Sequence, residues 1–319
     1  AFRGSPMLLM TASLPRARLE ALKSTLATTG ETLEIVNGPA ELETLKRYRL
    51  QQADEDHAWE QVRAAIASHK KVLWVANTVD RAIDLADRAD ALGLPVELYH
   101  SRYRYGDRLD RHNRVVQSFS DDVHEAVLAV TTQVCEISLD ISADLLVTDL
   151  APIPALIQRL GRLARRASPG SDIRPGIALV LEPGRSEPYD DAELAAARAW
   201  LDLLGCAPCS QADLAIAFEN VAGRAQQASY RQESAWLDGG LFATKSALRE
   251  EGTTIPVIRE EDAVGLAQPP DAVDVIRLTV PMPIGPVAKE LGNWRRVRGS
   301  FVAPAGRMLY DEQRGGRWR

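Results

Sequence analysis

The chain has 319 residues, of which 45% are hydrophobic and 26% are charged, as is typical of a globular protein with two or three domains. No apolar run is long enough to span a bilayer, and we expect neither a signal peptide nor contact with a membrane. The net charge of −6 is uneven, because residues 285–319 hold eight basic and three acidic residues. That segment is predicted to hold a nucleic-acid-binding patch, with a disordered basic tail as the alternative for its last ten residues.

The first predicted element is a buried strand at Met7–Thr11, and a helix is predicted from Pro15 to about Leu26. Natural domains seldom begin in the middle of a strand, so we expect the chain to be part of a longer protein. The three cysteines are too few for a disulfide framework. Cys206 and Cys209 have no second pair with which to hold zinc, so no metal site is predicted.

Short apolar strands alternate with helical patterns from about residue 33 onward. The predicted strands are Leu33–Val36, Val72–Ala76, Val96–Tyr99, Ala126–Val130, Leu145–Thr148 and Ile177–Leu181. The predicted helices cover residues 52–68, 79–92, 108–119 and 154–165. This alternation is typical of βαβ units, so we predict an α/β fold whose parallel sheet is covered by helices on both faces.

The pattern changes after residue 183. Residues 182–188 are rich in proline and glycine, as in a linker, and an alanine-rich helix is predicted near 190–204, with further helices up to about 250. Residues 253–319 contain short strand patterns among many prolines and glycines. We therefore predict a smaller mixed α+β domain at this end of the chain.

Four arginines fall within the nine residues from Gln158 to Arg166. If a helix continues through this segment, Arg162 shares its face with Gln158, Arg159, Arg165 and Arg166. Crowded guanidinium groups repel one another, and their planar donors suit phosphate oxygens. The segment is therefore predicted to meet an anion, and an arginine on a transferring γ-phosphate accelerates hydrolysis strongly. The alternative is a solvated basic helix end.

Polar residues also stand where predicted strands end. Asn77-Thr78 follows one strand, and Thr131-Thr132-Gln133 follows another, with Asp140 one loop later. Threonine hydroxyls at a strand end can donate hydrogen bonds to a phosphodiester, and a carboxylate can hold a ribose hydroxyl or a metal-bound water. Each of these signals is weak alone.

In chain order, however, four segments resemble the motifs of superfamily 2 helicases: Thr11-Ala12-Ser13, Asn77-Thr78, residues 131–140 and residues 158–165. The last is similar to the Q-x-x-G-R-x-x-R motif, and the first resembles the S/T-A-T motif that closes the first RecA-like domain. The resemblance narrows to the CRISPR-associated helicase–nuclease of type I systems on three segments: residues 98–103, 132–141 and 144–153. It is specific over residues 5–182 and weaker beyond them.

This resemblance implies a domain organisation. Residues 1–30 would be the tail of the first RecA-like domain and residues 31–183 the second RecA-like domain. Residues 184–252 would form a helical linker region, and residues 253–319 a C-terminal accessory domain.

The resemblance also implies a function. Members of the family are ATP-driven 3′-to-5′ translocases and helicases on single-stranded DNA. An RNA-guided surveillance complex recruits them to foreign DNA, which an N-terminal metal-dependent nuclease domain degrades. A cytoplasmic location, ATP and Mg²⁺ are expected for the complete enzyme.

Roles for individual residues follow from their motif positions. Arg162 and Arg165 would be arginine fingers on the γ-phosphate, and Gln158 would contact the nucleotide or its attacking water. The remaining ATP-binding residues would be Asp140, Gly161 and Arg159. The DNA-binding residues would be Thr78, Arg102, Thr132 and Gln133, and the residues that couple hydrolysis to movement would be Thr11 and Ser13.

Several family features are missing from the 319 residues. There is no G-x-x-x-x-G-K-[ST] loop to hold phosphates and magnesium, no DExH box ahead of Thr11 and no His-Asp nuclease cluster. Asp54-Glu55-Asp56-His57 has the letters of a DExH box, but it opens a predicted helix, where acids suit the helix dipole. We therefore expect the chain to bind no cofactor and to be inactive alone. Its expected partners are the missing N-terminal helicase and nuclease domains, without which Arg162 and Arg165 should face solvent.

Two other functions remain open: a non-catalytic RecA-like module that binds nucleic acid or protein, and another superfamily 2 helicase acting on DNA or RNA. Intact Gln158, Arg162, Arg165 and Asp140 favour a catalytic domain over a decayed one. For His100, which follows a strand, a hydrogen-bonding role at the surface or in a loop is favoured over catalysis.

Overall fold

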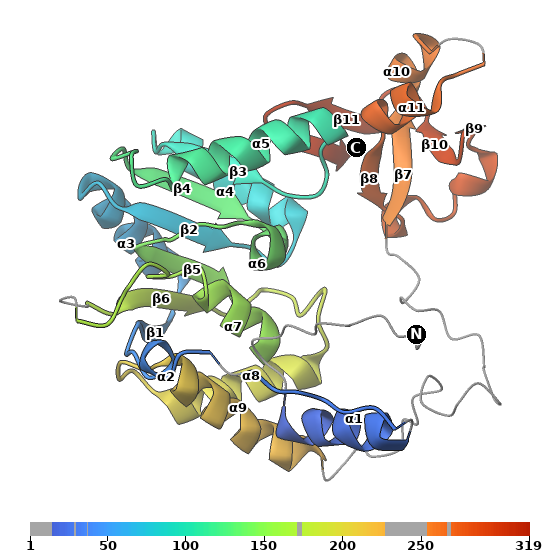
Figure 1. The fold of residues 1–319 in the computed structure, drawn as a ribbon. Coiled ribbons are helices and arrows are strands. Elements are labelled where there is room, and N and C mark those ends of the chain that lie inside the picture. The colour runs from blue at the N-terminus through green and yellow to red at the C-terminus, as the bar shows by residue number, and fades with distance from the viewer. Residues whose placement is uncertain (1–14, 29, 37, 171–173, 227–253, 267–268) are drawn as a thin grey trace.

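A six-stranded parallel sheet forms the centre of the computed structural model, which describes residues 15–28, 30–36, 38–170, 174–226, 254–266 and 269–319 (Figure 1). The strand order is β1-β6-β5-β2-β4-β3, and all paired neighbours are parallel. The strands are β1 (Tyr48–Ala53), β2 (Lys71–Val75), β3 (Val96–Tyr99), β4 (Val127–Thr131), β5 (Leu145–Asp149) and β6 (Gly176–Leu181). The predicted parallel α/β fold is confirmed.

Helices cover both faces of this sheet. On one face α3 (Glu55–Ala67) and α4 (Val79–Ala91) share a hydrophobic cluster with Val72 and Trp74 of β2. On the other face α5 (Tyr105–Ser118) and α7 (Ile153–Leu160) share a cluster with Leu73 and Val75. Neighbouring residues of a strand point to opposite faces, so a continuous apolar run such as 72–75 serves both clusters.

The predicted strand at Leu33–Val36 is wrong. Residues 33–36 form no strand, and the Val36 side chain is 86% exposed. The sheet instead begins with β1, which the sequence did not reveal because three of its six residues, Arg49, Gln51 and Gln52, are polar and only Tyr48 and Leu50 are buried. Such a pattern suits an edge strand with one solvated side.

The helix predicted over residues 154–165 ends at Leu160. Gly161 follows α7, the Arg162 amide donates to the Arg159 carbonyl, and Leu163 forms a parallel bridge with Ala143. The prediction that the arginines share one helical face is therefore wrong. Only Arg159 lies on the helix, and Arg162, Arg165 and Arg166 lie in the segment after it.

The predicted helix near 190–204 is confirmed as α8 (Asp191–Leu204), and α9 (Gln211–Gln226) follows it. Trp200 of α8 is fully buried, and its indole donates to the Leu214 carbonyl of α9. Residues of both helices belong to the same cluster as α5 and α7. The predicted N-terminal helix is confirmed as α1 (Arg16–Thr28), which has no buried residue and lies beside α9 (Figure 1).

The C-terminal residues form a separate, smaller assembly of strands, as the mixed pattern predicts. A four-stranded sheet has the order β8-β7-β10-β9. Its strands are β7 (Thr254–Arg259), β8 (Val280–Pro283), β9 (Arg296–Val297) and β10 (Ser300–Ala303). Two short helices, α10 (Glu260–Val264) and α11 (Ala272–Leu278), pack with it, and the last element is the antiparallel hairpin of β11 (Met308–Asp311) and β12 (Gly315–Trp318).

The proposed coupling residues, Thr11 and Ser13, lie outside the described residues. Among the helices that the structure describes, none has the length and apolar character needed to cross a membrane.

Candidate nucleotide and nucleic-acid sites

The predicted DNA-binding residues gather at one edge of the sheet. Thr78 follows β2, Arg102 follows β3, and Thr132 and Gln133 follow β4. All three strands are parallel, so their carboxyl ends meet at the same edge, which is where ligands bind in open α/β sheets.

Thr78 and Arg102 are linked through α4. The Thr78 hydroxyl caps this helix by accepting a hydrogen bond from the Arg81 amide at 3.3 Å. Asp80, in the first turn, pairs with both terminal nitrogens of Arg102 at 2.6 and 3.1 Å. The Arg102 side chain is 11% exposed whereas that of Asp80 is 65% exposed. The pair therefore fixes a mostly buried guanidinium at this edge, with the Asp80 carboxylate as its exposed member.

Thr132 and Gln133 differ in exposure, because Gln133 is only partly buried. Thr132 is buried, and the Gln133 amide donates to the Asn77 carbonyl at 2.7 Å and to the Tyr189 hydroxyl at 3.2 Å. Beside them lies a cavity of about 570 Å³ whose lining includes Thr78, Arg81 and Arg185. Of the four predicted residues, Arg102 and Thr132 are thus buried, whereas Thr78 and Gln133 have intermediate exposure.

The predicted nucleotide-binding residues lie around Arg162. Its guanidinium donates from Nε to the Cys135 carbonyl at 3.0 Å and from Nη2 to the Glu136 carbonyl at 2.7 Å. Both carbonyls belong to α6 (Val134–Ser138), and within the described residues no partner is recorded for Nη1. Burial, and then the nearby Arg165 charge, lower the pKa of Arg162. The structure thus fixes one side of this guanidinium and leaves the other available.

Arg165 and Asp140, both predicted from sequence, are brought together beside Arg162. Arg165 Nε lies 3.1 Å from Asp140 Oδ1, and their side chains are 45% and 84% exposed. The expectation that both arginines face solvent is confirmed for Arg165 and only in part for Arg162, which is half-buried. Gln158 and Gly161 flank this place at intermediate exposure.

A close backbone approach fixes this segment to the sheet. A Cβ on Gly176, at the start of β6, would lie 2.7 Å from Leu163 Cγ, so only glycine fits there without a shift of Leu163. On the other side, the Ala143 amide donates to the Arg162 carbonyl at 2.8 Å. Arg162 is therefore held by its backbone as well as by its side chain.

Arg159 differs from the sequence prediction of an ATP contact. Its side chain is completely buried and has no surface to offer a nucleotide. Nε donates to Glu136 Oε1 at 2.9 Å and Nη2 to the Tyr189 hydroxyl at 3.2 Å. Nη1 donates to Asn77 Oδ1, the Thr148 hydroxyl and the Asp149 carbonyl at 3.1, 2.8 and 3.1 Å. A buried guanidinium needs such a set of acceptors. We call Arg159 and its five hydrogen-bond partners the internal hub.

This hub joins the two groups of predicted residues. Glu136 lies in α6, whose carbonyls hold Arg162, and Asn77 immediately precedes Thr78. Burial raises the pKa of the Glu136 carboxyl, although Arg159 opposes this effect. The sequence analysis missed Glu136 and Tyr189. Only the excess of polar residues within apolar surroundings could have indicated them.

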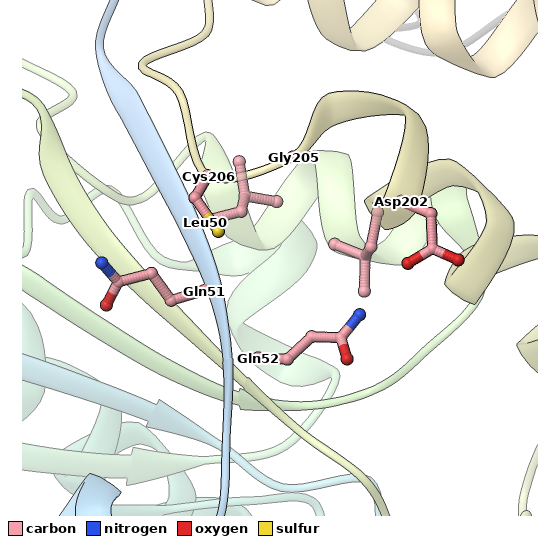
Figure 2. Close-up of a pocket in the computed structure, with 7 residues that line it drawn as sticks. Leu50, Gln51, Gln52, Asp202, Gly205 and Cys206 are labelled. Carbon is pink, nitrogen blue, oxygen red and sulfur yellow. The ribbon is translucent and has the colours of Figure 1, made fainter.

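Figure 2 shows a cavity of about 550 Å³ between β1 and the end of α8, lined by Gln51, Gln52 and Cys206 among others, and it contains no predicted site residue. No cluster of potential metal ligands exists among the described residues. Asp54 caps α3 by accepting from the His57 amide, so the helix-start interpretation of residues 54–57 is confirmed.

Known proteins with similar sequences share part of their length with this chain. Residues 68–168 match the family model of the CRISPR-associated nuclease/helicase Cas3 C-terminal region. The chain is 44% identical over 324 residues to a putative CRISPR-associated nuclease/helicase Cas3 of Myxococcus xanthus, an alignment that covers 100% of this chain and 42% of the relative. It is 36% identical over 111 residues to the CRISPR-associated endonuclease/helicase Cas3 of Escherichia coli, covering 33% of this chain and 12% of that protein.

The fold agrees with these relatives. The crystal structure of T. fusca Cas3-AMPPNP superimposes with a TM-score of 0.70 at 17% identity, over 96% of this chain and 50% of that one. At this identity the likeness concerns the fold alone. The chain spans about two fifths of the length of its M. xanthus relative.

Proposed function

We propose that this chain forms the arginine-bearing half of an ATP-driven motor on single-stranded DNA. The basis is its homology to the C-terminal helicase region of Cas3 nuclease/helicases. The motor moves 3′ to 5′ and serves a helicase–nuclease that degrades foreign DNA in the cytoplasm. The other half of the ATP site, with its phosphate-binding loop, belongs to a partner domain, and this chain alone does not hydrolyse ATP.

The observation that carries this proposal is the geometry of Arg162. Two hydrogen bonds to the carbonyls of α6 orient its guanidinium, and Nη1 remains available to a phosphate oxygen. A preorganised donor costs no reorganisation when charge develops on the γ-phosphate, which is why such groups are effective in phosphoryl transfer. Arg165, half-exposed beside it, adds a second positive charge.

These residues are better suited to bind ATP than to coordinate a metal ion. Guanidinium groups fit phosphate oxygens, whereas the Asp140 carboxylate is paired with Arg165 and supplies no ligand set for magnesium. We assign Arg162 and Arg165 to the γ-phosphate, Gln158 to the nucleotide or its attacking water, and Asp140 and Gly161 to the rim of the site. Mg²⁺ would be held by the partner domain. Structural neighbours that include T. fusca Cas3-ATP and Cas3-ADP support the nucleotide.

The carboxyl edge of the sheet is assigned to the DNA backbone, with Thr78 and Arg102 as its principal contacts. Contacts to phosphates carry no sequence information, as a motor that runs on any sequence requires. A CRISPR RNA-guided surveillance complex is among the structural neighbours, and we propose such a complex as the partner that delivers the DNA.

We expect this chain to bind a fluorescein-labelled oligothymidine more tightly than the matching oligouridine, and to release it as salt rises. Arg102→Ala should weaken binding about tenfold, because a hydrogen bond to a charged group is lost. Arg63→Ala is the control, since Arg63 is an exposed arginine of α3 and the charge change is the same. Fluorescence anisotropy measures all three proteins. Equal losses in both variants, or a preference for the RNA strand, would contradict the assignment.

A further inference from the structure

The hairpin of β11 and β12 is docked onto the loop that carries Arg102. The Gly316 amide donates to the Arg102 carbonyl at 2.8 Å, and the Tyr103 hydroxyl donates to the Gln313 carbonyl at 2.8 Å. The Arg104 amide donates to the Tyr310 hydroxyl at 3.1 Å. Three consecutive residues of the loop are thus hydrogen-bonded to a segment more than 200 positions away in sequence.

His100 lies inside this junction. It is fully buried and stacks on the Tyr103 ring with centroids 4.3 Å apart. Its Nδ1 accepts from the Arg102 amide at 3.1 Å, so its Nε2 must carry the hydrogen that is donated to the Arg314 carbonyl at 3.1 Å. Burial lowers the pKa of His100 to about 3, which keeps the ring neutral and in this arrangement near neutral pH. One imidazole therefore joins the backbone of the loop to the backbone of the hairpin.

Gly315 allows the hairpin to lie directly against the loop. A Cβ at this position would lie 2.5 Å from the Arg102 carbonyl oxygen and 2.8 Å from His100 Cε1, and the residue has φ +74°. Any side chain there would push the hairpin away from the loop.

The same hairpin also forms ion pairs with α4, the helix that bears Asp80. Arg314 pairs with Asp87 and Asp90, and Arg317 pairs with Asp84. Asp80 in turn holds the Arg102 guanidinium. Both the backbone of Arg102 and the partner of its side chain are therefore attached to one C-terminal element.

We propose that the β11–β12 hairpin is a positioning element for Arg102. It fixes this guanidinium at the carboxyl edge of the sheet, so that the C-terminal assembly sets the strength of a DNA-backbone contact in the motor domain. This inference rests on the proposed function, because it takes the phosphodiester as the ligand of Arg102. Gly315 and His100 act through Arg102 and touch no DNA.

The test uses two glycines with the same backbone strain. Gly315→Ala introduces the collision with Arg102, whereas Gly306→Ala, at φ +72°, meets only Arg319 Nη1 at an ordinary 3.8 Å. His100→Phe is a second route, because phenylalanine keeps the ring against Tyr103 but has neither nitrogen. Each variant of the chain is examined by amide hydrogen exchange at Arg102 and by oligothymidine binding at several salt concentrations, alone and combined with Arg102→Ala.

The Arg102 amide should be protected from exchange in the parent chain and in Gly306→Ala, and should lose protection in Gly315→Ala and His100→Phe. Those two variants should bind oligothymidine about tenfold more weakly, with a salt slope smaller by about 0.7, as for one lost phosphate contact on a single strand. Neither change should weaken binding further once Arg102 is already alanine, because residues that act through one group are not additive.

The outcomes separate this inference from the function on which it rests. Retained protection in Gly315→Ala and His100→Phe, or losses of affinity that add to that of Arg102→Ala, would overturn the positioning role alone. Absence of oligothymidine binding by the parent chain would overturn the proposed function and, with it, the role of the hairpin toward DNA, even if the protection of Arg102 changes as expected.

Discussion

Replacing Arg162 by alanine in the complete enzyme is expected to reduce the rate of ATP hydrolysis about a thousandfold or more, the scale on which arginine fingers act. The reason is that the guanidinium is already oriented by the Cys135 and Glu136 carbonyls and offers its free nitrogen to charge that develops in the transition state. Affinities for ATP and for single-stranded DNA should change little, because the effect is concentrated in the transition state. Steady-state hydrolysis with saturating DNA measures the first quantity, and equilibrium binding measures the others.

Two further variants test whether hydrolysis depends on the oriented guanidinium of Arg162 or on positive charge alone. Arg162→Lys should not restore activity, because an ammonium cannot hold two carbonyls in a fixed fork while also reaching a phosphate. Arg166→Ala is the matched control, since Arg166 lies in the same segment with an exposed side chain paired to Asp121. A loss for Arg166→Ala as large as that for Arg162→Ala would mean that general positive charge, and not the oriented finger, drives hydrolysis.

The second large effect concerns stability. Arg159→Ala is expected to lower the free energy of unfolding by about 3–5 kcal/mol, as when one partner of a buried ion pair is removed. It leaves Glu136 Oε1 and Asn77 Oδ1 without the donor that they now share, and it opens a cavity in the interior. Urea denaturation followed by tryptophan fluorescence measures this change.

The control for Arg159 is a surface pair. Arg198 donates two hydrogen bonds of 2.9 Å to Glu182, yet both side chains are about half-exposed. Arg198→Ala should therefore cost less than about 1 kcal/mol. If Arg159→Ala destabilised the protein no more than this, the internal hub would be a minor feature of the fold.

These arginines show why the sequence predicted the fold better than the positions of individual side chains. Strands such as β2 were readable because both of their faces are buried and the apolar run is continuous. The end of α7 was not, because it depends on a bridge between Leu163 and the distant Ala143. The sequence alone therefore does not distinguish Arg159, which is completely buried, from Arg162, which is half-buried.

The junction around Arg102 shows the same limit at longer range. Sequence analysis singled out Arg102 and His100. The hydrogen-bonding role favoured for His100 is confirmed, but this residue is fully buried and not at the surface. It could not identify Asp80 as the partner of Arg102, nor Gly315 as the residue that admits the hairpin. Those contacts join segments whose proximity is set by the whole fold, and no local pattern records it.

The measurement that tests the central claim most directly is ATP hydrolysis by this chain alone, and by the chain mixed with the part of the M. xanthus relative that it does not cover, each with single-stranded DNA and each repeated with Arg162→Ala. We expect no hydrolysis by the chain alone, and hydrolysis in the mixture that requires both the DNA and Arg162. Hydrolysis by the chain alone that disappears in Arg162→Ala would contradict the account, because it would mean that a complete ATP site lies within these 319 residues.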